Sequence, residues 1–110
     1  MKARCKVWLE TERGKVALSD WRVHLLETVE LHGSLAEAAR RLGVPYKTAW
    51  YKLKEMEASL GTPLLLSSSG GAAHGGAHLT AAGEQAVERY RRITAGLDEL
   101  VEQRFRTEFS

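Results

Sequence analysis

Residues 33–60 read GSLAEAARRLGVPYKTAWYKLKEMEASL. Ser34 and, three residues later, Glu37 form an S-x-x-E capping box, which predicts that a short Ala-rich helix begins here and covers residues 35–42. The glycine that follows is expected to end this helix. Pro45 then suits the first turn of a second helix, because the N–H that proline lacks would have no partner within a helix at that position.

This second helix is expected to run to about residue 60. Its apolar residues recur at steps of four, three and four, which places them on one buried face. They are Ala49, Leu53, Met56 and Leu60. A short helix, a glycine turn and a basic helix that packs through small residues are typical of a helix-turn-helix, whose second helix enters the DNA major groove.

The flanking sequence extends this unit to a winged helix. Residues 20–32 repeat apolar side chains at helical spacing, and residues 64–66 and 77–79 predict two short strands joined by a Ser- and Gly-rich loop, the wing. β-branched and aromatic residues around a glycine turn predict a hairpin within residues 1–18. The predicted fold is therefore mainly α: a winged helix-turn-helix with a short N-terminal β-hairpin, a two-stranded wing and a long C-terminal dimerisation helix.

The C-terminal helix predicts an assembly. Thr80 suits its N-cap, and an α-helix from there to Phe105 would be about 39 Å long, longer than a domain of this size can cover. Its apolar residues recur at steps of four and three along one seam, which is expected to pair with an identical chain. The predicted dimer interface consists of Ala86, Tyr90, Ile93, Leu97, Leu100 and Val101.

Length and composition limit the class of protein. The 110 residues suit a single domain over 1–110, comprising the hairpin (1–18), the winged helix (19–79) and the dimerisation helix (80–107). A hydrophobic content of 44% is ordinary for a soluble globular protein, and no apolar run is long enough for a membrane span or a signal peptide. We therefore expect a cytoplasmic protein without a membrane partner.

The distribution of charge predicts a polyanionic partner. The net charge is only +2, yet residues 40–54 carry five basic and no acidic side chains, whereas residues 61–110 have a net charge of −1. We expect double-stranded DNA to be the partner, bound sequence-specifically by a transcription regulator that acts as a homodimer on a palindromic operator. The expected base contacts are Tyr46, Lys47, Trp50 and Tyr51, and the expected phosphate contacts include Ser34, Arg40, Arg41 and Lys54.

Several short motifs resemble a known family. They are GSLAEAA at 33–39, GVPYKTAW at 43–50, Glu55-Met56 and LTAAG at 79–83. They are similar to the N-terminal winged-helix domain of ModE-type molybdate-responsive regulators, and LGTPLL at 60–65 gives a wider likeness to the LysR-type winged helix. The resemblance covers roughly residues 19–107 and implies a DNA-binding transcription regulator.

Two departures from that family limit what the resemblance implies. No room follows the winged helix for the family's molybdate-binding domains, so the resemblance does not imply molybdate sensing, and a molybdate or other oxyanion effector is not supported by this chain alone. An oxyanion pocket at the dimer interface is a third alternative, which the sequence neither supports nor excludes. The wing of the family usually carries a lysine among its glycines, whereas His74 occupies this region here. We therefore expect this wing to bind phosphate more weakly than the family's, or His74 to contact phosphate only when its imidazole is protonated.

The sequence also offers alternatives to DNA binding. The main alternative is a winged-helix protein-interaction module that uses Trp50 and Tyr51, on the aromatic face of the basic helix, as a hot spot. His74 and His78 lack a third ligand nearby in sequence, and one cysteine, Cys5, cannot form a multi-cysteine zinc site or an internal disulfide. No Ser/His/Asp set or carboxylate pair can be assembled, so we expect no enzymatic activity, no metal and no cofactor. The operator, the regulated genes and the sign of regulation are not encoded in these patterns.

Overall fold

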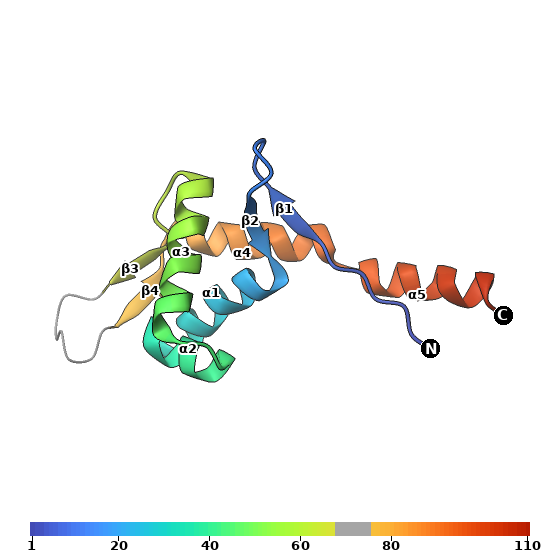
Figure 1. Cartoon of the computed structure of the whole chain (residues 1–110), viewed down its shortest axis with the longest axis horizontal. Helices are drawn as coiled ribbons and strands as arrows, with labels where there is room; N and C mark the ends of the chain where they lie inside the picture. Colours follow the sequence, from blue (N-terminus) through green and yellow to red (C-terminus); the bar gives the residue numbers. More distant parts are fainter. Residues whose placement is uncertain (68–75) are drawn as a thin grey trace.

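The computed structural model describes residues 1–67 and 76–110, which form an elongated winged helix-turn-helix (Figure 1). The overall extents are 58 × 30 × 22 Å. In chain order the elements are β1 (Trp8–Glu10), β2 (Val16–Ser19), α1 (Asp20–His32), α2 (Leu35–Leu42), α3 (Tyr46–Leu60), β3 (Leu65–Ser67), β4 (Ala77–Leu79), α4 (Ala81–Thr94) and α5 (Leu97–Glu108). The mainly α winged-helix prediction is confirmed.

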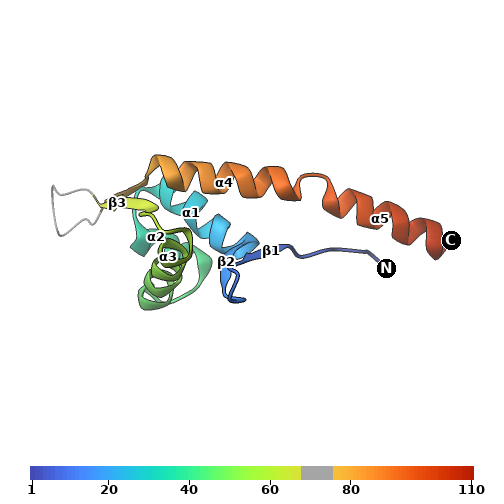
Figure 2. The same cartoon turned by 90° about the horizontal axis from the view of Figure 1, so that it is seen from above.

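Helix α1 lies at the centre of the core. It packs against α2 and α3 on one side and against α4 on the other, as Figure 2 shows. Val23, Leu25, Leu26 and Val29 of α1 are fully buried. They meet small buried residues of the neighbouring helices, which allow close approach of the backbones (Ala38, Ala39 and Ala49).

Side-chain caps set the helix boundaries, as the sequence predicts. The hydroxyl oxygens of Ser19, Ser34 and Thr80 each accept a hydrogen bond from the backbone N–H three residues on, at 2.9 to 3.2 Å. Gly33 and Gly43 follow α1 and α2 in the left-handed conformation, with φ of 75° and 71°. These caps place the helix-turn-helix where the motif predicts it.

Two antiparallel hairpins flank the helices. In the N-terminal hairpin β1 pairs with β2, with an irregularity in register between Leu9 and Glu10. In the wing, β3 pairs with β4, so that Leu65 faces Leu79 across the ladder. The predicted first wing strand began one residue earlier, at Leu64. That side chain is instead fully buried in the core.

The prediction of one continuous C-terminal helix is wrong. The helix stops at Thr94, Ala95 has an extended ψ of 128°, and Gly96 has a left-handed φ of 78° before α5 begins. Glycine adopts this φ without steric strain and is a poor helix former, so a break is favoured there.

The prediction for Leu60 is also wrong. It was expected on the buried face of α3, but it is the last residue of that helix and is 39% exposed. Within the described ranges, no helix is long and apolar enough to cross a lipid bilayer.

Candidate nucleic-acid interface

The exposed face of α3 is defined by the residues that the helix buries. Ala49, Leu53 and Met56 are at most 5% exposed and fix the inward side. The opposite side therefore faces solvent, and it gathers three aromatic and two basic residues. These are Tyr46, Lys47, Trp50, Tyr51 and Lys54, all of them exposed. We refer to these five residues as the α3 face.

The side chains of the α3 face are organised against one another. The rings of Trp50 and Tyr51 meet edge to face with centroids 5.3 Å apart. Lys54 Nζ lies 5.5 Å from the centroid of the Trp50 ring, and Lys47 Nζ lies 5.8 Å from that of Tyr51. Cation–π contacts at exposed sites are worth about 0.5–1 kcal/mol each. The two lysines are thus held over apolar rings, on a surface that is both cationic and apolar.

Helix α2 carries a cluster of opposite charges, with Glu37 in its first turn and Arg40 and Arg41 in its last turn. The Glu37 carboxylate accepts hydrogen bonds from both Arg40 and Arg41, with Arg41 Nε at 3.0 Å. The hydrogen bond from Arg40 is the main reason that the pKa of Glu37 falls from 4.5 to about 2. Of the two hydrogen bonds of the predicted capping box, the one from the Glu37 N–H to the Ser34 hydroxyl is therefore formed, and the Glu37 carboxylate bonds elsewhere. Ser34 caps the helix, whereas the Glu37 side chain reaches forward to two arginines predicted for phosphate contact.

The other basic residues of the 40–54 segment also have carboxylate neighbours. Lys52 Nζ lies 3.7 Å from Glu55, and Lys54 Nζ lies 3.2 Å from Glu57. Lys47 differs from them, because no carboxylate oxygen among the described residues lies within 4.0 Å of it.

The net charge of this region is consequently lower than the segment 40–54 suggests. Extending the segment by three residues at each end adds three carboxylates and reduces its net charge from +5 to +2. Helical i, i+3 and i, i+4 spacing was the signal that could have shown these pairs in the sequence.

The base of the wing is attached to the turn between α1 and α2. Ala77 N donates to the Gly33 carbonyl at 2.8 Å, and Ser34 forms a β-bridge with Gly76. Leu79 N also donates to Glu30 at 2.7 Å. The wing strands thus lie beside the N-terminus of α2, where the Ser34 hydroxyl forms its cap. The predicted phosphate contact His74 lies outside the described residues.

Arg22 is a buried cation that the sequence did not single out. Its side chain is 10% exposed, and Nη2 donates to Glu55 of α3 at 3.2 Å. Nη1 is buried and has no hydrogen-bond partner among the described residues. This pair joins the first turn of α1 to the middle of α3, so it helps to hold the recognition helix against the core.

The predicted dimer seam divides into two parts. Ala86 and Tyr90 are buried within the chain's own core, at 9% and 1% exposure. The seam residues that follow are half-buried or exposed, and Ile93 and Leu100 are exposed by 49% and 41%. They are Ile93, Leu97, Leu100 and Val101, with Phe105 beyond them.

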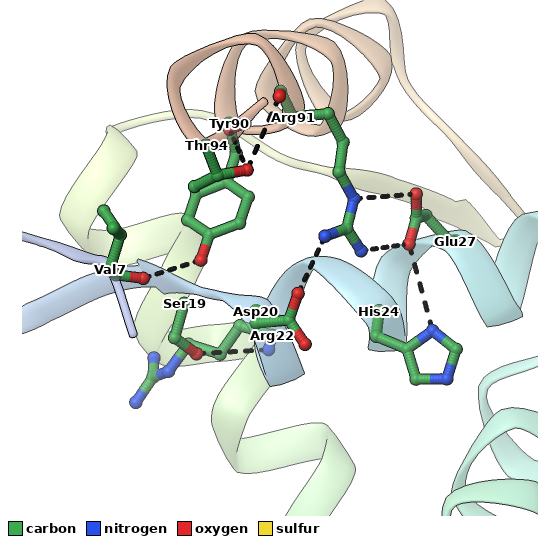
Figure 3. Close-up of polar contacts among 9 residues, drawn as sticks. All are labelled: Val7, Ser19, Asp20, Arg22, His24, Glu27, Tyr90, Arg91 and Thr94. Carbon is green, nitrogen blue, oxygen red and sulfur yellow. Dashed lines mark hydrogen bonds and ion pairs between the residues drawn. The ribbon is translucent and has the colours of Figure 1, made fainter. Parts of the chain in front are cut away.

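A network of ion pairs docks α4 onto α1, as Figure 3 shows. Arg91 donates to Glu27 at 2.6 and 3.2 Å and to Asp20 at 2.7 Å. Next to it, the Tyr90 hydroxyl donates to the Val7 carbonyl at 2.6 Å. Hydrogen bonds from Arg91 to Glu27 and then to Asp20 raise the pKa of the guanidinium further. The first part of the seam is thus fixed within the chain, and only the later part is free for a partner.

Comparison with known proteins places these features in context. Residues 22–84 match the family described as bacterial regulatory helix-turn-helix protein, lysR family. The chain is 38% identical over 98 residues to the molybdenum-pterin-binding protein MopB of Rhodobacter capsulatus, covering 89% of this chain and 36% of that protein. It is 39% identical over 85 residues to the molybdenum transport protein ModE of Azotobacter vinelandii, covering 77% and 31%. The chain thus spans about a third of the length of these curated relatives.

Solved structures give the same fold. The crystal structure of the CbnR_DBD-DNA complex superposes with a TM-score of 0.63 at 32% sequence identity, covering 82% of this chain and 97% of that one. CbnR itself, described as a LysR family transcriptional regulator, gives a TM-score of 0.59, covering 78% of this chain and 28% of that one.

Proposed function

Because the chain belongs to the lysR family of bacterial regulatory helix-turn-helix proteins, we propose that it binds double-stranded DNA sequence-specifically and regulates transcription, acting as a homodimer on a palindromic operator. The observation that carries the proposal is the α3 face. It presents cations and aromatic rings together on the helix that a helix-turn-helix inserts into the major groove.

Within this proposal the residues of the α3 face have different roles. Lys47, which has no carboxylate partner among the described residues, is available for a bidentate contact to guanine O6 and N7. Tyr46, Trp50 and Tyr51 offer ring edges and hydroxyls to base edges and to the methyl group of thymine. Lys54 lies further along the helix, at the position for a phosphate contact.

Helix α2 and its N-cap supply the remaining proposed phosphate contacts. Ser34 lies at a helix N-terminus, which favours anions. Arg40 and Arg41 have exposed side chains, at 71% and 49%. Exposed ion pairs contribute little to stability. If Arg40 and Arg41 left the Glu37 carboxylate and paired with a DNA phosphate instead, the change in free energy would therefore be small. His74 in the wing remains a sequence-based candidate for this set.

The homodimer is proposed from the exposed part of the seam. No residue of α5 is buried in the single chain, although the helix presents Leu97, Leu100, Val101 and Phe105 along one side. A second copy would cover this surface by an isologous contact. Two α3 helices one or two DNA turns apart, roughly 34–36 Å per turn, would then read both halves of a palindrome.

The experiment begins with the selection of bound fragments from a random-sequence DNA pool. We expect an enriched palindromic site. Its affinity for wild type and Lys47→Ala is then measured over a series of salt concentrations. Lys47→Ala should lower the affinity by about 1–3 kcal/mol and relax discrimination at one base pair. Lys15→Ala, which removes an exposed lysine from the turn of the N-terminal hairpin, is the matched control and should change neither.

The alternative, a protein-interaction module, is decided by the same measurements. Binding dominated by phosphate contacts weakens steeply with salt. The logarithm of the association constant falls with the logarithm of the salt concentration, with a slope of about −0.9 per phosphate contact. An aromatic protein contact through Trp50 and Tyr51 would depend little on salt. A pool that yields no enriched sequence, together with DNA affinity that Lys47→Ala leaves unchanged, contradicts the proposed function.

A further inference from the structure

The N-terminal segment lies alongside the C-terminal helix. Residues 1–7 run beside α5 and the end of α4 in both views (Figures 1 and 2). The backbone N–H of Ala3 donates to Glu102 Oε2 at 2.7 Å, and that of Cys5 donates to Asp98 Oδ1 at 3.2 Å. We call residues 3–7 the strap.

The strap is also attached to α4. The Val7 carbonyl accepts the hydrogen bond from the Tyr90 hydroxyl at 2.6 Å, and Tyr90 is itself buried in the core. The strap therefore contacts both sides of the break between the two helices. At one end it is anchored to the folded body, and at the other it holds α5.

Little else positions α5. The joint at Ala95 and Gly96 is exposed, and no residue of α5 is buried. Over the described part of the chain, the polar contacts from α5 to other elements are those that Asp98 and Glu102 make with the strap. Glycine adopts positive and negative φ with similar ease, so the backbone at Gly96 does not by itself fix the direction of α5, and these contacts select the one observed.

A cavity lies beneath the joint. Its volume is about 570 Å³, and its lining includes Cys5, Lys6 and Val7 of the strap, Trp8 of β1, the start of α1 and the helix ends around Thr94 and Leu97. Because this space is not filled by side chains, packing does not lock α5 in place. The orientation of α5 then depends on hydrogen bonds to charged acceptors, which are the stronger class of hydrogen bond.

The Cys5 side chain adds to the same contact. Its Sγ lies 3.5 Å from Asp98 Oδ1, as a donor to the carboxylate. Desolvation and then the hydrogen bond to Asp98 raise the pKa of the thiol. The thiol therefore stays protonated and keeps its donor at neutral pH.

We propose that the strap fixes the direction of α5 relative to the helix-turn-helix, with Asp98 and Glu102 as positioning residues, and so sets the separation of the two recognition helices in the dimer. This inference rests on the proposed homodimeric function. In a dimer built on the exposed seam, a change in the angle at Gly96 displaces the whole helix-turn-helix of each protomer. The two backbone hydrogen bonds from the strap to α5 would thus determine which spacing of half-sites the dimer can bind.

The primary test measures the direction of α5 within one chain. Spin labels are attached at Ala36→Cys and Arg106→Cys, two exposed positions on α2 and α5, with Cys5→Ser in every variant. Labelled protein is diluted into an excess of unlabelled protein, so that the distances report on single chains. We expect a narrow distance distribution that Asp98→Ala/Glu102→Ala broadens or shifts by several ångströms. Glu99→Ala/Glu108→Ala, which removes two other carboxylates of α5, is the matched control and should leave it unchanged.

A second variant and a second measurement test whether a broadened distance distribution comes from loss of the strap contacts or from unfolding. Deletion of residues 1–5 removes the two N–H donors but leaves β1 intact, and it should broaden the distribution in the same way. Affinity is then measured for selected DNA sites that differ only in half-site spacing. The ratio of the affinity at the best spacing to that at other spacings should be about tenfold smaller for both altered proteins than for wild type. Their affinity for a single half-site should equal that of wild type.

The possible failures are distinguishable. A distance distribution that neither the double substitution nor the deletion changes overturns the strap, whatever the state of assembly. Sedimentation that shows wild type to be monomeric on and off DNA contradicts the homodimer instead, and with it the link to half-site spacing.

Discussion

Replacing Gly83 with alanine tests how closely α4 must pack against the base of the wing. Gly83 is buried in the first turn of α4. A Cβ atom placed there would lie 2.4 Å from the Leu64 carbonyl oxygen, 3.3 Å from the Leu64 carbonyl carbon and 3.3 Å from Leu79 Cδ2. The nearest atom is backbone, so no side-chain rotation can relieve the contact.

Two opposing effects determine how much Gly83→Ala changes the free energy of unfolding. In an exposed helix interior, alanine in place of glycine stabilises by about 1 kcal/mol. Here the Leu64 carbonyl also accepts the Thr80 N–H at 3.0 Å, so moving it away weakens the bond that joins the wing to the helix N-terminus. Overpacking of this kind costs about 1–3 kcal/mol, and more when backbone must shift. We therefore expect a net loss of roughly 1–2 kcal/mol in the free energy of unfolding.

Urea denaturation followed by circular dichroism measures this loss, and thermal denaturation should show a lower midpoint, by about 4–8 °C per kcal/mol. Gln85→Ala, at an exposed position two residues on, is the control and should stay within about 0.5 kcal/mol of wild type. A Gly83→Ala protein as stable as wild type, or more so, would refute the argument that α4 and the wing base are in contact too close for a side chain.

Three further predictions concern the caps, the response to acid and the dimer. Ser34→Ala removes the side-chain cap of α2 and should lower the free energy of unfolding by about 1 kcal/mol; an unchanged urea midpoint would contradict it. The pKa of Glu37 is depressed to about 2, chiefly by Arg40, so the modest stabilisation from this exposed pair should be complete above pH 4.5 and lost as the pH falls towards 2. Glu37→Gln should flatten that part of the stability profile, and a profile identical to wild type would exclude the pair as its source. Leu100→Glu places a charge on the exposed seam and should yield monomers in sedimentation with little change in the thermal midpoint; a persistent dimer would remove this residue from the interface.

The sequence predicted the helix-turn-helix well because its signals are local. A cap such as Ser34 depends on the next three residues, and the buried face of α3 depends on spacing within one helix. The same spacing placed Tyr46, Trp50 and Tyr51 on the outside. Family resemblance then added the winged-helix context, which periodicity alone does not provide.

The C-terminal half was predicted less well because its signals are not local. The apolar steps from Ala86 to Leu100 continue across Gly96 without interruption, so the pattern conceals the break. Which seam residues remain exposed depends on how α4 packs against α1. The strap cannot be inferred from spacing at all, since Ala3 and Glu102 are 99 residues apart.

In the proposed homodimer, the charges around α3 give a reason for half-site spacing to matter. The neighbouring carboxylates reduce the positive charge available for phosphate, and Lys47 is the basic residue of the 40–54 segment without such a neighbour in the described chain. Each phosphate contact by Arg40, Arg41 or Lys54 would replace an existing carboxylate contact, which lowers the gain per contact and is expected to leave a single half-site weakly bound. A regulator of this kind gains its operator affinity from the second half-site, which is bound at a high effective concentration only if the geometry permits both contacts. Under this proposal, Asp98 and Glu102 would contribute to specificity although they lie outside the α3 face, because they would help to decide whether the second α3 reaches its groove.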